Sequence, residues 1–256
     1  MSEPILEMRG VEKRFGGVRA IDEFSLKVEP GMVYGLIGPN GAGKTTIFNT
    51  ITGIYHVDAG KILFQGKDIT KVEPHQAARL GIARTFQNIR LFGNLSVKSN
   101  VEISCNMNAG YHLGDALLRT PRYRRVTKET EERAMEFLKI VGLADKGKER
   151  ASSLPYGHQR KLEIARAMAT NPKLLLLDEP AAGMNADESL ELVEFIRELK
   201  ERFQITILMI EHHMDVVTSL CDACTVLNFG KTLAAGTVEE IKKNPEVIAA
   251  YLGGDE

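Results

Sequence analysis

The fold is decided by residues 32–46, MVYGLIGPNGAGKTT. Residues 32–37 have the length and apolar character of a short buried strand, and residues 47–53 (IFNTITG) predict a helix after the loop. The loop fits GxxxxGK[ST], in which glycines let consecutive backbone N–H groups turn inward around phosphates. The sequence therefore predicts a phosphate-binding loop formed by Gly38, Pro39, Asn40, Gly41, Ala42, Gly43, Lys44, Thr45 and Thr46.

Two side chains of this loop have predicted roles. Lys44 is expected to reach the β- and γ-phosphates of a nucleotide, and the Thr45 hydroxyl is expected to ligate Mg²⁺. The alternative is a glycine-rich turn that binds nothing. The flanking strand and helix favour the nucleotide site.

A second apolar run, residues 174–177 (LLLL), ends in Asp178 and Glu179. It predicts a buried parallel strand, and the carboxyl end of such a strand is where ligands bind. At that edge we expect Asp178 to hold Mg²⁺, directly or through water, and Glu179 to polarise an attacking water. The alternative is that both acids are simply solvated at the strand end. A phosphate loop needs acidic residues nearby to hold Mg²⁺ and polarise water, which favours the functional interpretation.

Residues 205–210 (ITILMI) predict a third strand, which delivers Glu211, His212 and His213 to the same edge. A single histidine there would usually be a surface or capping residue. Two adjacent histidines beside a phosphate site indicate that one of them acts in the chemistry.

A proline and a glycine crowd the start of a further helix, where LPYGHQ (residues 154–159) runs into RKLEIARAMAT. Apolar residues recur there at i, i+3, i+4 and i+7, which predicts Glu163 and Arg166 on the solvent side. Pro155 and Gly157 fix an entry turn and leave a small helix N-terminus, which favours an anion.

Composition narrows the class of protein. The 256 residues include 33 Lys and Arg against 34 Asp and Glu, so no overall charge draws the chain to nucleic acid. Its apolar runs are far shorter than the roughly 20 residues that cross a bilayer, and its first ten residues lack the apolar stretch of a secretory signal. We therefore expect a cytoplasmic protein.

Cys221 and Cys224 form one CxxC, which is half of a zinc site or a redox pair. Because no second CxxC completes a zinc site, we expect small buried thiols.

Together these stretches resemble the nucleotide-binding subunit of ABC transporters over nearly the whole chain. The resemblance implies an α/β fold with a P-loop NTPase core, an N-terminal antiparallel β subdomain and an inserted helical subdomain at about residues 88–168, all in one ABC ATPase domain of residues 1–256. Alternating polarity in residues 5–31, with turns at residues 16–17 and 30–31, indicates the β subdomain. Residues 128–141 give the clearest amphipathic helix, with Gly142 as its expected end.

The resemblance also implies site roles, with ATP as the ligand. LPYGHQ occupies the place of the family's signature motif, usually Leu-Ser-Gly-Gly-Gln. Two subunits pair head to tail in that family, so Gly157 of one would close on the γ-phosphate held by Lys44 of the other. Gln87 matches the Q-loop glutamine that contacts Mg²⁺ and water, His212 matches the switch histidine, and Phe15 matches the aromatic residue that stacks on adenine.

The chain departs from the family's pattern in two places. The signature serine is Pro155 and the first signature glycine is Tyr156, so we expect the Gly157 backbone and the helix dipole to close the site without a hydroxyl. His213 stands where relatives of this branch commonly carry an acid. We favour His212 as the switch residue because it directly follows the acid at the strand end.

Two surface stretches bear on partners. Residues 87–92 (QNIRLF) are expected to receive a coupling helix of a membrane permease, although Ile89, Leu91 and Phe92 could equally be core residues. Residues 119–125 (RTPRYRR) form a basic cluster. A solvated loop is one interpretation, and contact with lipid headgroups or a membrane protein is the other.

Four stretches match more closely the ATPases of branched-chain amino acid importers. They are residues 80–88 (LGIARTFQN), the signature with its following RKLEIAR, residues 178–183 (DEPAAG) and the ending at residues 244–253 (NPEVIAAYLG). The resemblance implies an ATP-hydrolysing importer subunit, peripheral at the cytoplasmic face of the inner (plasma) membrane. Its partners would be a second ATPase of the LivF type, or a second copy in an ATP dimer, with two permease subunits and, indirectly, a substrate-binding protein.

Other cargoes and another class of protein are alternatives. The same chemistry would serve an amide or urea importer, or a lipopolysaccharide-extraction ATPase, whose signature keeps the serine and two glycines. A DNA- or RNA-associated ABC ATPase would carry a long coiled coil or two nucleotide domains, for which 256 residues leave no room. A binding module without catalysis would not need Glu179.

Overall fold

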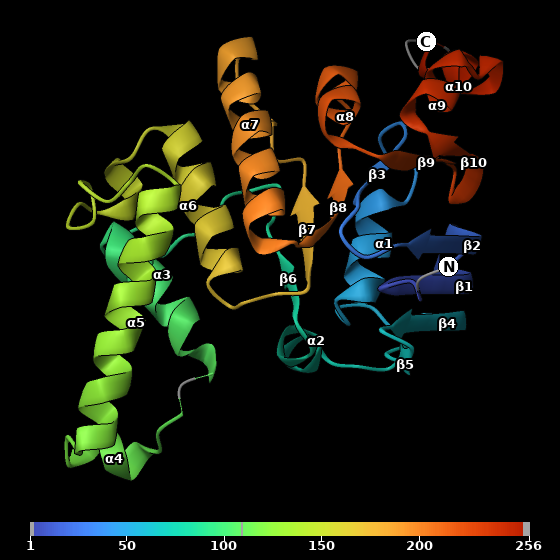
Figure 1. Ribbon diagram of the computed structural model, residues 1–256. Coiled ribbons are helices and arrows are strands. Elements are labelled where there is room, and N and C mark those ends of the chain that lie inside the picture. The colour runs from blue at the N-terminus through green and yellow to red at the C-terminus, as the bar shows by residue number, and fades with distance from the viewer. Residues whose placement is uncertain (1–2, 109, 253–256) are drawn as a thin grey trace. The chain divides into compact units, whose positions relative to one another are not determined.

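A computed structural model describes residues 3–108 and 110–252 (Figure 1). Gly253, the last residue of the 244–253 ending, lies outside the described residues. The chain divides into two compact units, one comprising Met1–Gln87 with Lys173–Glu256 and the other Asn88–Pro172.

The first unit contains a six-stranded sheet in the order β10-β9-β3-β8-β7-β6. Its strands are β3 (Val33–Ile37), β6 (Ile82–Arg84), β7 (Leu174–Asp178), β8 (Thr206–Ile210), β9 (Ala223–Asn228) and β10 (Lys231–Thr237). Neighbours from β9 to β6 are parallel, whereas β10 pairs antiparallel with β9. The three apolar runs of the sequence become β3, β7 and β8, which are buried along their whole length and lie side by side. Their carboxyl ends therefore meet at one edge, as predicted.

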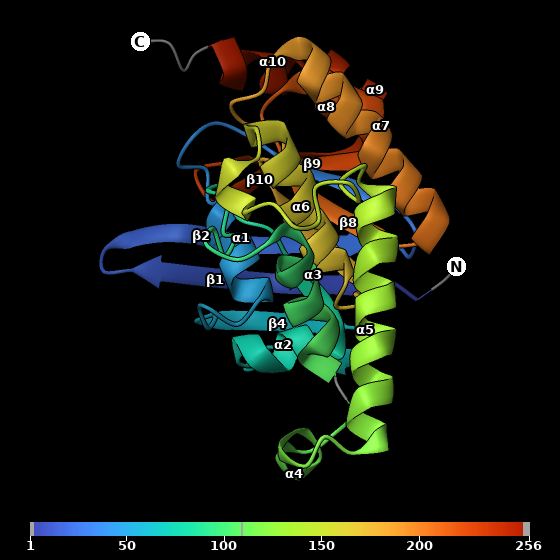
Figure 2. The same cartoon turned by 90° about the vertical axis from the view of Figure 1, so that its left-hand side faces the viewer.

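An antiparallel sheet of the same unit has the order β2-β1-β4-β5. Its strands are β1 (Leu6–Phe15), β2 (Val18–Val28), β4 (Ala59–Phe64) and β5 (Lys67–Asp68). Figure 2 shows β1 and β2 as a long hairpin with β4 beside β1. The predicted hairpin turn at residues 16–17 is confirmed. The sequence did not predict β4 and β5, because the burial of β4 alternates only over its last four residues and β5 has two exposed residues.

Helix α1 (Lys44–Ile51) joins the two sheets into one core. Its residues Ile47, Phe48 and Ile51 are buried in a cluster that also contains side chains of β1, β2, β4, β7 and β8. The other helices of this unit are α2 (Pro74–Leu80), α7 (Ala186–Phe203), α8 (Met214–Leu220), α9 (Val238–Lys243) and α10 (Pro245–Leu252). Within the described ranges, no helix combines the length and apolar character needed to span a bilayer.

The second unit is helical. It contains α3 (Val97–Cys105), η1 (Asn106–Asn108), α4 (Leu113–Leu117), α5 (Pro121–Ile140), η2 (Ala151–Ser153) and α6 (Tyr156–Met168). Helix α3 packs against both α5 and α6. Figure 1 shows α4 at one end of the long helix α5.

Residues 121–125 of the basic cluster are helical, which corrects the interpretation of the whole cluster as a solvated loop, whereas Arg119 and Thr120 lie in the turn before α5. Thr120 caps α5 by accepting a hydrogen bond from the Tyr123 amide (3.3 Å), and Pro121 occupies the first helical position. Helix α5 therefore begins seven residues before the predicted residue 128 (128 − 121 = 7). Its predicted end is confirmed, because Gly142 follows the last turn with a φ of 68°.

Glu163 on α6 is buried, although periodicity predicted it on the solvent side. Its carboxylate accepts from Arg160 Nη1 at 2.8 Å and from the Arg90 amide at 3.0 Å. A buried charge is tolerated when it is paired and hydrogen-bonded, and periodicity cannot show such partners.

Candidate active site

The loop that follows β3 has a backbone that only glycine fits at two positions. A Cβ on Gly38 would lie 2.2 Å from the Leu227 carbonyl oxygen, and a Cβ on Gly43 would lie 2.4 Å from the Ala20 carbonyl oxygen. Gly43 also has a φ of 104° and immediately precedes α1. These close approaches fix the loop against β2 and β9, with its amide-rich turn at the start of a helix.

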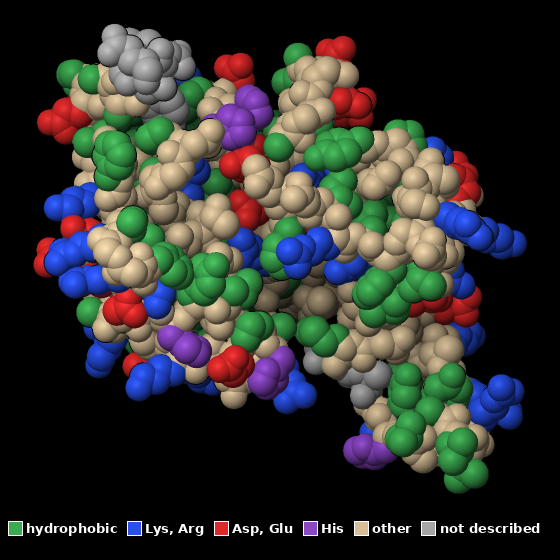
Figure 3. All heavy atoms as spheres, turned by 180° about the vertical axis from the view of Figure 1, so that it is seen from behind, with side chains coloured by type: hydrophobic (Ala, Val, Ile, Leu, Met, Phe, Trp, Pro, Cys, Tyr) green, Lys and Arg blue, Asp and Glu red, His purple; other side chains and the backbone are tan. Residues whose placement is uncertain are grey.

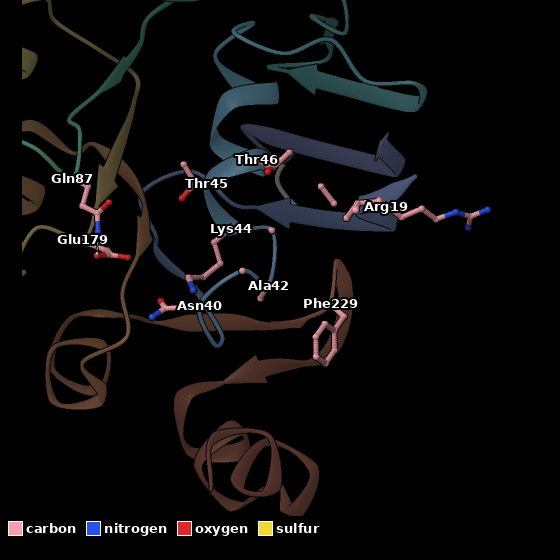
Figure 4. A pocket seen from close by; sticks show the side chains of 13 residues that line it. Arg19, Asn40, Ala42, Lys44, Thr45, Thr46, Gln87, Glu179 and Phe229 are labelled. Carbon is pink, nitrogen blue, oxygen red and sulfur yellow. Dashed lines mark hydrogen bonds between the residues drawn. The ribbon is translucent and has the colours of Figure 1, made fainter. Parts of the chain in front are cut away.

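A cavity of about 380 Å³ lies beside this loop (Figure 4). Of the predicted residues, Asn40, Gly41, Ala42, Gly43, Lys44, Thr45, Thr46, Gln87 and Glu179 line it. Figure 4 shows Gln87 and Glu179 on one side of Lys44, and Arg19 and Phe229 on the other. The structure thus brings the phosphate loop and Glu179, the acid that follows β7, to one cavity.

Lys44 is buried and donates two hydrogen bonds to its own loop. Its Nζ lies 2.6 Å from the Gly38 carbonyl oxygen and 2.9 Å from the Pro39 carbonyl oxygen. Burial lowers the pKa of Lys44, while the carboxylates of Glu179 and Asp178 act in the opposite direction. Gly38 and Pro39 therefore contribute carbonyl groups that hold the lysine.

Glu179 follows β7 in a left-handed conformation, with a φ of 46°. Such a conformation is strained for a residue with a side chain, and strain of this kind gathers at functional sites. The Glu179 amide donates to the Ile210 carbonyl oxygen at 2.9 Å, which holds the residue at the sheet edge. Its carboxylate accepts from Gln87 Nε2 at 2.7 Å and lies 3.9 Å from His212 Nδ1. Three residues predicted from different parts of the chain thus meet at one carboxylate.

Glu211 distinguishes the two histidines that follow it. Its buried carboxylate accepts from the amides of Ala181, His212 and His213 at 3.0, 3.0 and 3.2 Å. The His213 ring bonds the same carboxylate through Nδ1 at 3.1 Å. The His212 ring faces Glu179 instead, so only the first histidine points to the predicted chemistry.

Asp178 is buried at the end of β7 and pairs with Arg84, a residue that sequence reasoning missed. Arg84 Nη2 lies 2.8 Å from Asp178 Oδ2, with the two side chains 6% and 5% exposed, and its Nη1 donates to Asn49 Oδ1 at 2.6 Å. The guanidinium also lies 5.4 Å from the Phe48 ring centre and 5.0 Å from that of Phe86. The available signal was a cation that ends a short apolar run, Ile82-Ala83-Arg84, before the predicted Q-loop.

Phe15 is not among the residues that line this cavity. It lies at the end of β1, 43% exposed, with its ring 5.1 Å from that of Tyr55 in an edge-to-face contact. Among the described residues, the aromatic side chain that lines the cavity is Phe229, which is 84% exposed with a φ of 45°. Its neighbour Gly230 bonds the Ala42 carbonyl oxygen through its amide at 2.9 Å, which ties the β9–β10 turn to the phosphate loop.

The signature stretch lies in the second unit. Pro155 is the N-cap of α6 with a ψ of 152°, and its ring makes no capping hydrogen bond to the helix start. Gly157 is in the first turn of α6. This helix start therefore offers backbone N–H groups and the positive end of its dipole, as predicted.

The predicted metal ligands suit Mg²⁺ by their chemistry. The Thr45 hydroxyl, the Gln87 amide oxygen and the Asp178 carboxylate are hard oxygen donors, which Mg²⁺ prefers. Thr45 and Gln87 line the cavity, whereas Asp178 is 3% exposed and held by Arg84. Mg²⁺ commonly keeps several of its waters, so a buried carboxylate can hold it through one of them.

The cysteines of the CxxC are free thiols. Cys224 is buried and Cys221 is half-buried, and both pack against Gly35 of β3. Burial raises the pKa of Cys224 to about 11 and raises the pKa of Cys221 as well. Because thiolates bind metals and thiols bind them weakly, these raised pKa values favour the expected structural role.

Comparisons with known proteins show which family the chain resembles. A family model of ABC transporters matches residues 21–182, and one of branched-chain amino acid ATP-binding cassette transporters matches residues 231–256. The chain is 45% identical over 253 residues to the high-affinity branched-chain amino acid transport ATP-binding protein LivG of Escherichia coli, covering 99% of each chain. The same figures hold for BraF of Pseudomonas aeruginosa, which carries the same description. A solved ATP-binding cassette of an ABC transporter in its ADP conformation shares the fold, with a TM-score of 0.84, 32% identity, and coverage of 98% of this chain and 100% of that one.

Proposed function

This chain belongs to the ABC transporter family of ATPases, and on that premise we propose that it powers the import of branched-chain amino acids. The observation that carries hydrolysis is the carboxylate of Glu179, which is held between Gln87 and His212 beside the phosphate loop. The cargo is supported by the names of the full-length relatives and by the family model at the C-terminal end.

ATP binding is assigned to the loop of residues 38–46. Its amides and the N-terminus of α1 face the phosphates, and Lys44 exchanges the carbonyl groups of Gly38 and Pro39 for phosphate oxygens. The lowered pKa of the buried lysine reflects the cost of holding its charge there, which bound phosphates offset. Phe15 is proposed to stack on adenine, and its edge-to-face contact with Tyr55 holds the ring in place.

Hydrolysis is assigned to Glu179. Its carboxylate accepts a proton from the attacking water as the water oxygen bonds to the γ-phosphorus and the bond to the leaving ADP oxygen breaks. Gln87 orients the carboxylate through its hydrogen bond, and His212 is placed to contact the γ-phosphate. When bound, Mg²⁺ neutralises charge on the phosphates; Thr45, Gln87 and Asp178 would hold it, Asp178 through water.

The complete site is proposed to form between two subunits. Gly157 at the start of α6 would close on the γ-phosphate of the partner's ATP, since the first turn of α6 carries backbone N–H groups and the positive end of the helix dipole. The second subunit would be a LivF-like ATPase or another copy of this chain. Residues 87–92 would receive a permease; in support, Phe92 is 47% exposed, and Ile89 and Leu91 are only half-buried. Such a subunit would lie peripherally on the cytoplasmic face of the membrane.

The proposal is tested by reconstitution in vesicles with a LivF-like ATPase, two permease subunits and a leucine-binding protein. We expect ATP turnover to rise when the binding protein carries leucine, isoleucine or valine, and Glu179→Gln to abolish both turnover and uptake. If an amide or urea stimulated turnover instead, the proposed cargo would be wrong, but the assignment of ATP hydrolysis to this subunit would remain. Turnover unaffected by Glu179→Gln would overturn the assignment of the base.

A further inference from the structure

The second unit carries an exposed hydrophobic patch at one end. Leu113, Leu117 and Leu118, which we name the leucine tip, are 87%, 82% and 77% exposed. Figure 3 shows hydrophobic side chains gathered over α4 at the lower right. Single exposed leucines are ordinary, but three within six residues form a patch of the kind that marks contact with a protein or a membrane.

Hydrogen bonds hold the tip in a defined shape. The Asp115 carboxylate accepts from the His112 amide at 3.1 Å and from the Thr120 hydroxyl at 2.9 Å. These bonds, that of the His112 amide first, lower the pKa of Asp115. Tyr111 packs edge to face on Tyr123 of α5, with the ring centres 5.2 Å apart. These hydrogen bonds therefore fix the turn that carries the leucines, and they also engage Asp115, the one acidic residue of the turn.

Four arginines follow the leucine tip along the chain. Arg119, Arg122, Arg124 and Arg125 are all exposed, and Arg125 Nε lies 3.8 Å from Glu129 Oε1 in an exposed ion pair. Residues 111–125 contain these four arginines and one acid, Asp115, for a formal charge of +3 (4 − 1), whereas the whole chain carries −1. The patch is thus a local cationic surface on a chain with no overall positive charge.

We propose that the leucine tip and its arginines dock on an anionic phospholipid surface. Leucines enter the region between headgroups and acyl chains, where their transfer from water is favourable, and guanidinium groups bond lipid phosphates. Charge complementarity selects this occupant, because anionic bilayers attract arginines beside an apolar patch. The inference does not depend on the cargo.

Flotation of the full-length chain with vesicles tests the contact directly. Vesicles of phosphatidylglycerol with phosphatidylcholine should carry the protein upward, vesicles of phosphatidylcholine alone should not, and roughly 0.5 M salt should weaken the binding. Leu117→Ser with Leu118→Ser should lower the partition constant at least about tenfold. Arg122→Gln with Arg124→Gln should lower it by a similar factor, at about fivefold for each charge.

Leu190→Ser is the matched control, because Leu190 is 61% exposed on α7 of the first unit. It should float like the unaltered chain, and every variant should keep its circular dichroism spectrum and ATP turnover. Failure of the unaltered chain to float with anionic vesicles would overturn the proposal. Equal flotation with both lipid mixtures would also overturn it. So would leucine-tip variants that bind lipid normally but no longer assemble with a permease in detergent, because that result would assign the leucine tip to a protein partner.

Discussion

At the scale of single residues, the two adjacent histidines make the sharpest prediction. His212→Ala should lower ATP turnover by roughly 10²- to 10³-fold, as removal of a positioned group at a developing charge does. His213→Ala should lower it only a few fold, because its ring bonds Glu211 and not the carboxylate of Glu179. Steady-state turnover of the two variants with the same partners decides between them. The opposite order would move the switch role to His213.

Arg84 supplies a second prediction at this scale. Arg84→Met leaves Asp178 buried without its cation, and the loss of one partner of a buried pair costs about 3–5 kcal/mol of unfolding free energy. Arg14→Met, which removes an exposed partner of Glu12, should cost about 0–1 kcal/mol. Urea unfolding measures both variants. Equal losses would show that the Arg84–Asp178 pair does not stabilise the fold.

At the scale of elements, the phosphate loop tests whether close backbone approach requires its glycines. Gly41 and Gly43 both have positive φ values, of 79° and 104°. A Cβ on Gly41 would meet nothing within 4 Å, whereas a Cβ on Gly43 would lie 2.4 Å from the Ala20 carbonyl oxygen. Gly41→Ala should cost about 1 kcal/mol from backbone strain alone. Gly43→Ala should cost at least about 2 kcal/mol because the backbone of β2 must also move. Unfolding without nucleotide compares them, and equal costs would contradict the role of the close approach.

The start of the signature helix α6 lacks the serine hydroxyl that is usual in the family. If the backbone at Gly157 and the helix dipole close the partner's site, Pro155→Ser should change ATP turnover of the assembled pair only a few fold. A single missing anion donor can cost roughly 10²- to 10³-fold when nothing replaces it. If Pro155→Ser raised ATP turnover by that much, the absent serine hydroxyl would be limiting turnover, and the backbone and dipole of α6 would not be compensating for its loss.

The sequence predicted those elements whose structure follows from their own residues, without contacts to distant parts of the chain. The apolar runs that became β3, β7 and β8 are buried on both faces, so their composition alone indicated strands and placed Glu179 at a strand end. Strand β4, the early start of α5 and the burial of Glu163 depend on tertiary partners and capping, which periodicity does not encode. The Asp178–Arg84 pair went unpredicted for the same reason, because its members are 94 residues apart.

At the scale of the whole molecule, the two units divide the chemistry. The phosphate loop, Asp178, Glu179 and His212 belong to the first unit, whereas Gly157 belongs to the second. The proposed pairing of subunits gives each ATP a loop from one chain and a signature helix from the other. On this proposal ATP joins two subunits, and hydrolysis at Glu179 ends the joined state.

Size-exclusion chromatography with light scattering on Glu179→Gln, with and without ATP and with and without a LivF-like ATPase, tests that claim most directly. We expect a dimer that requires ATP and that forms with the LivF-like partner, since loss of the base blocks hydrolysis and leaves ATP bound. A dimer of this chain alone would make the pair symmetric and weaken the branched-chain assignment. The absence of any ATP-dependent dimer would contradict the role given to Gly157 and the account built on it.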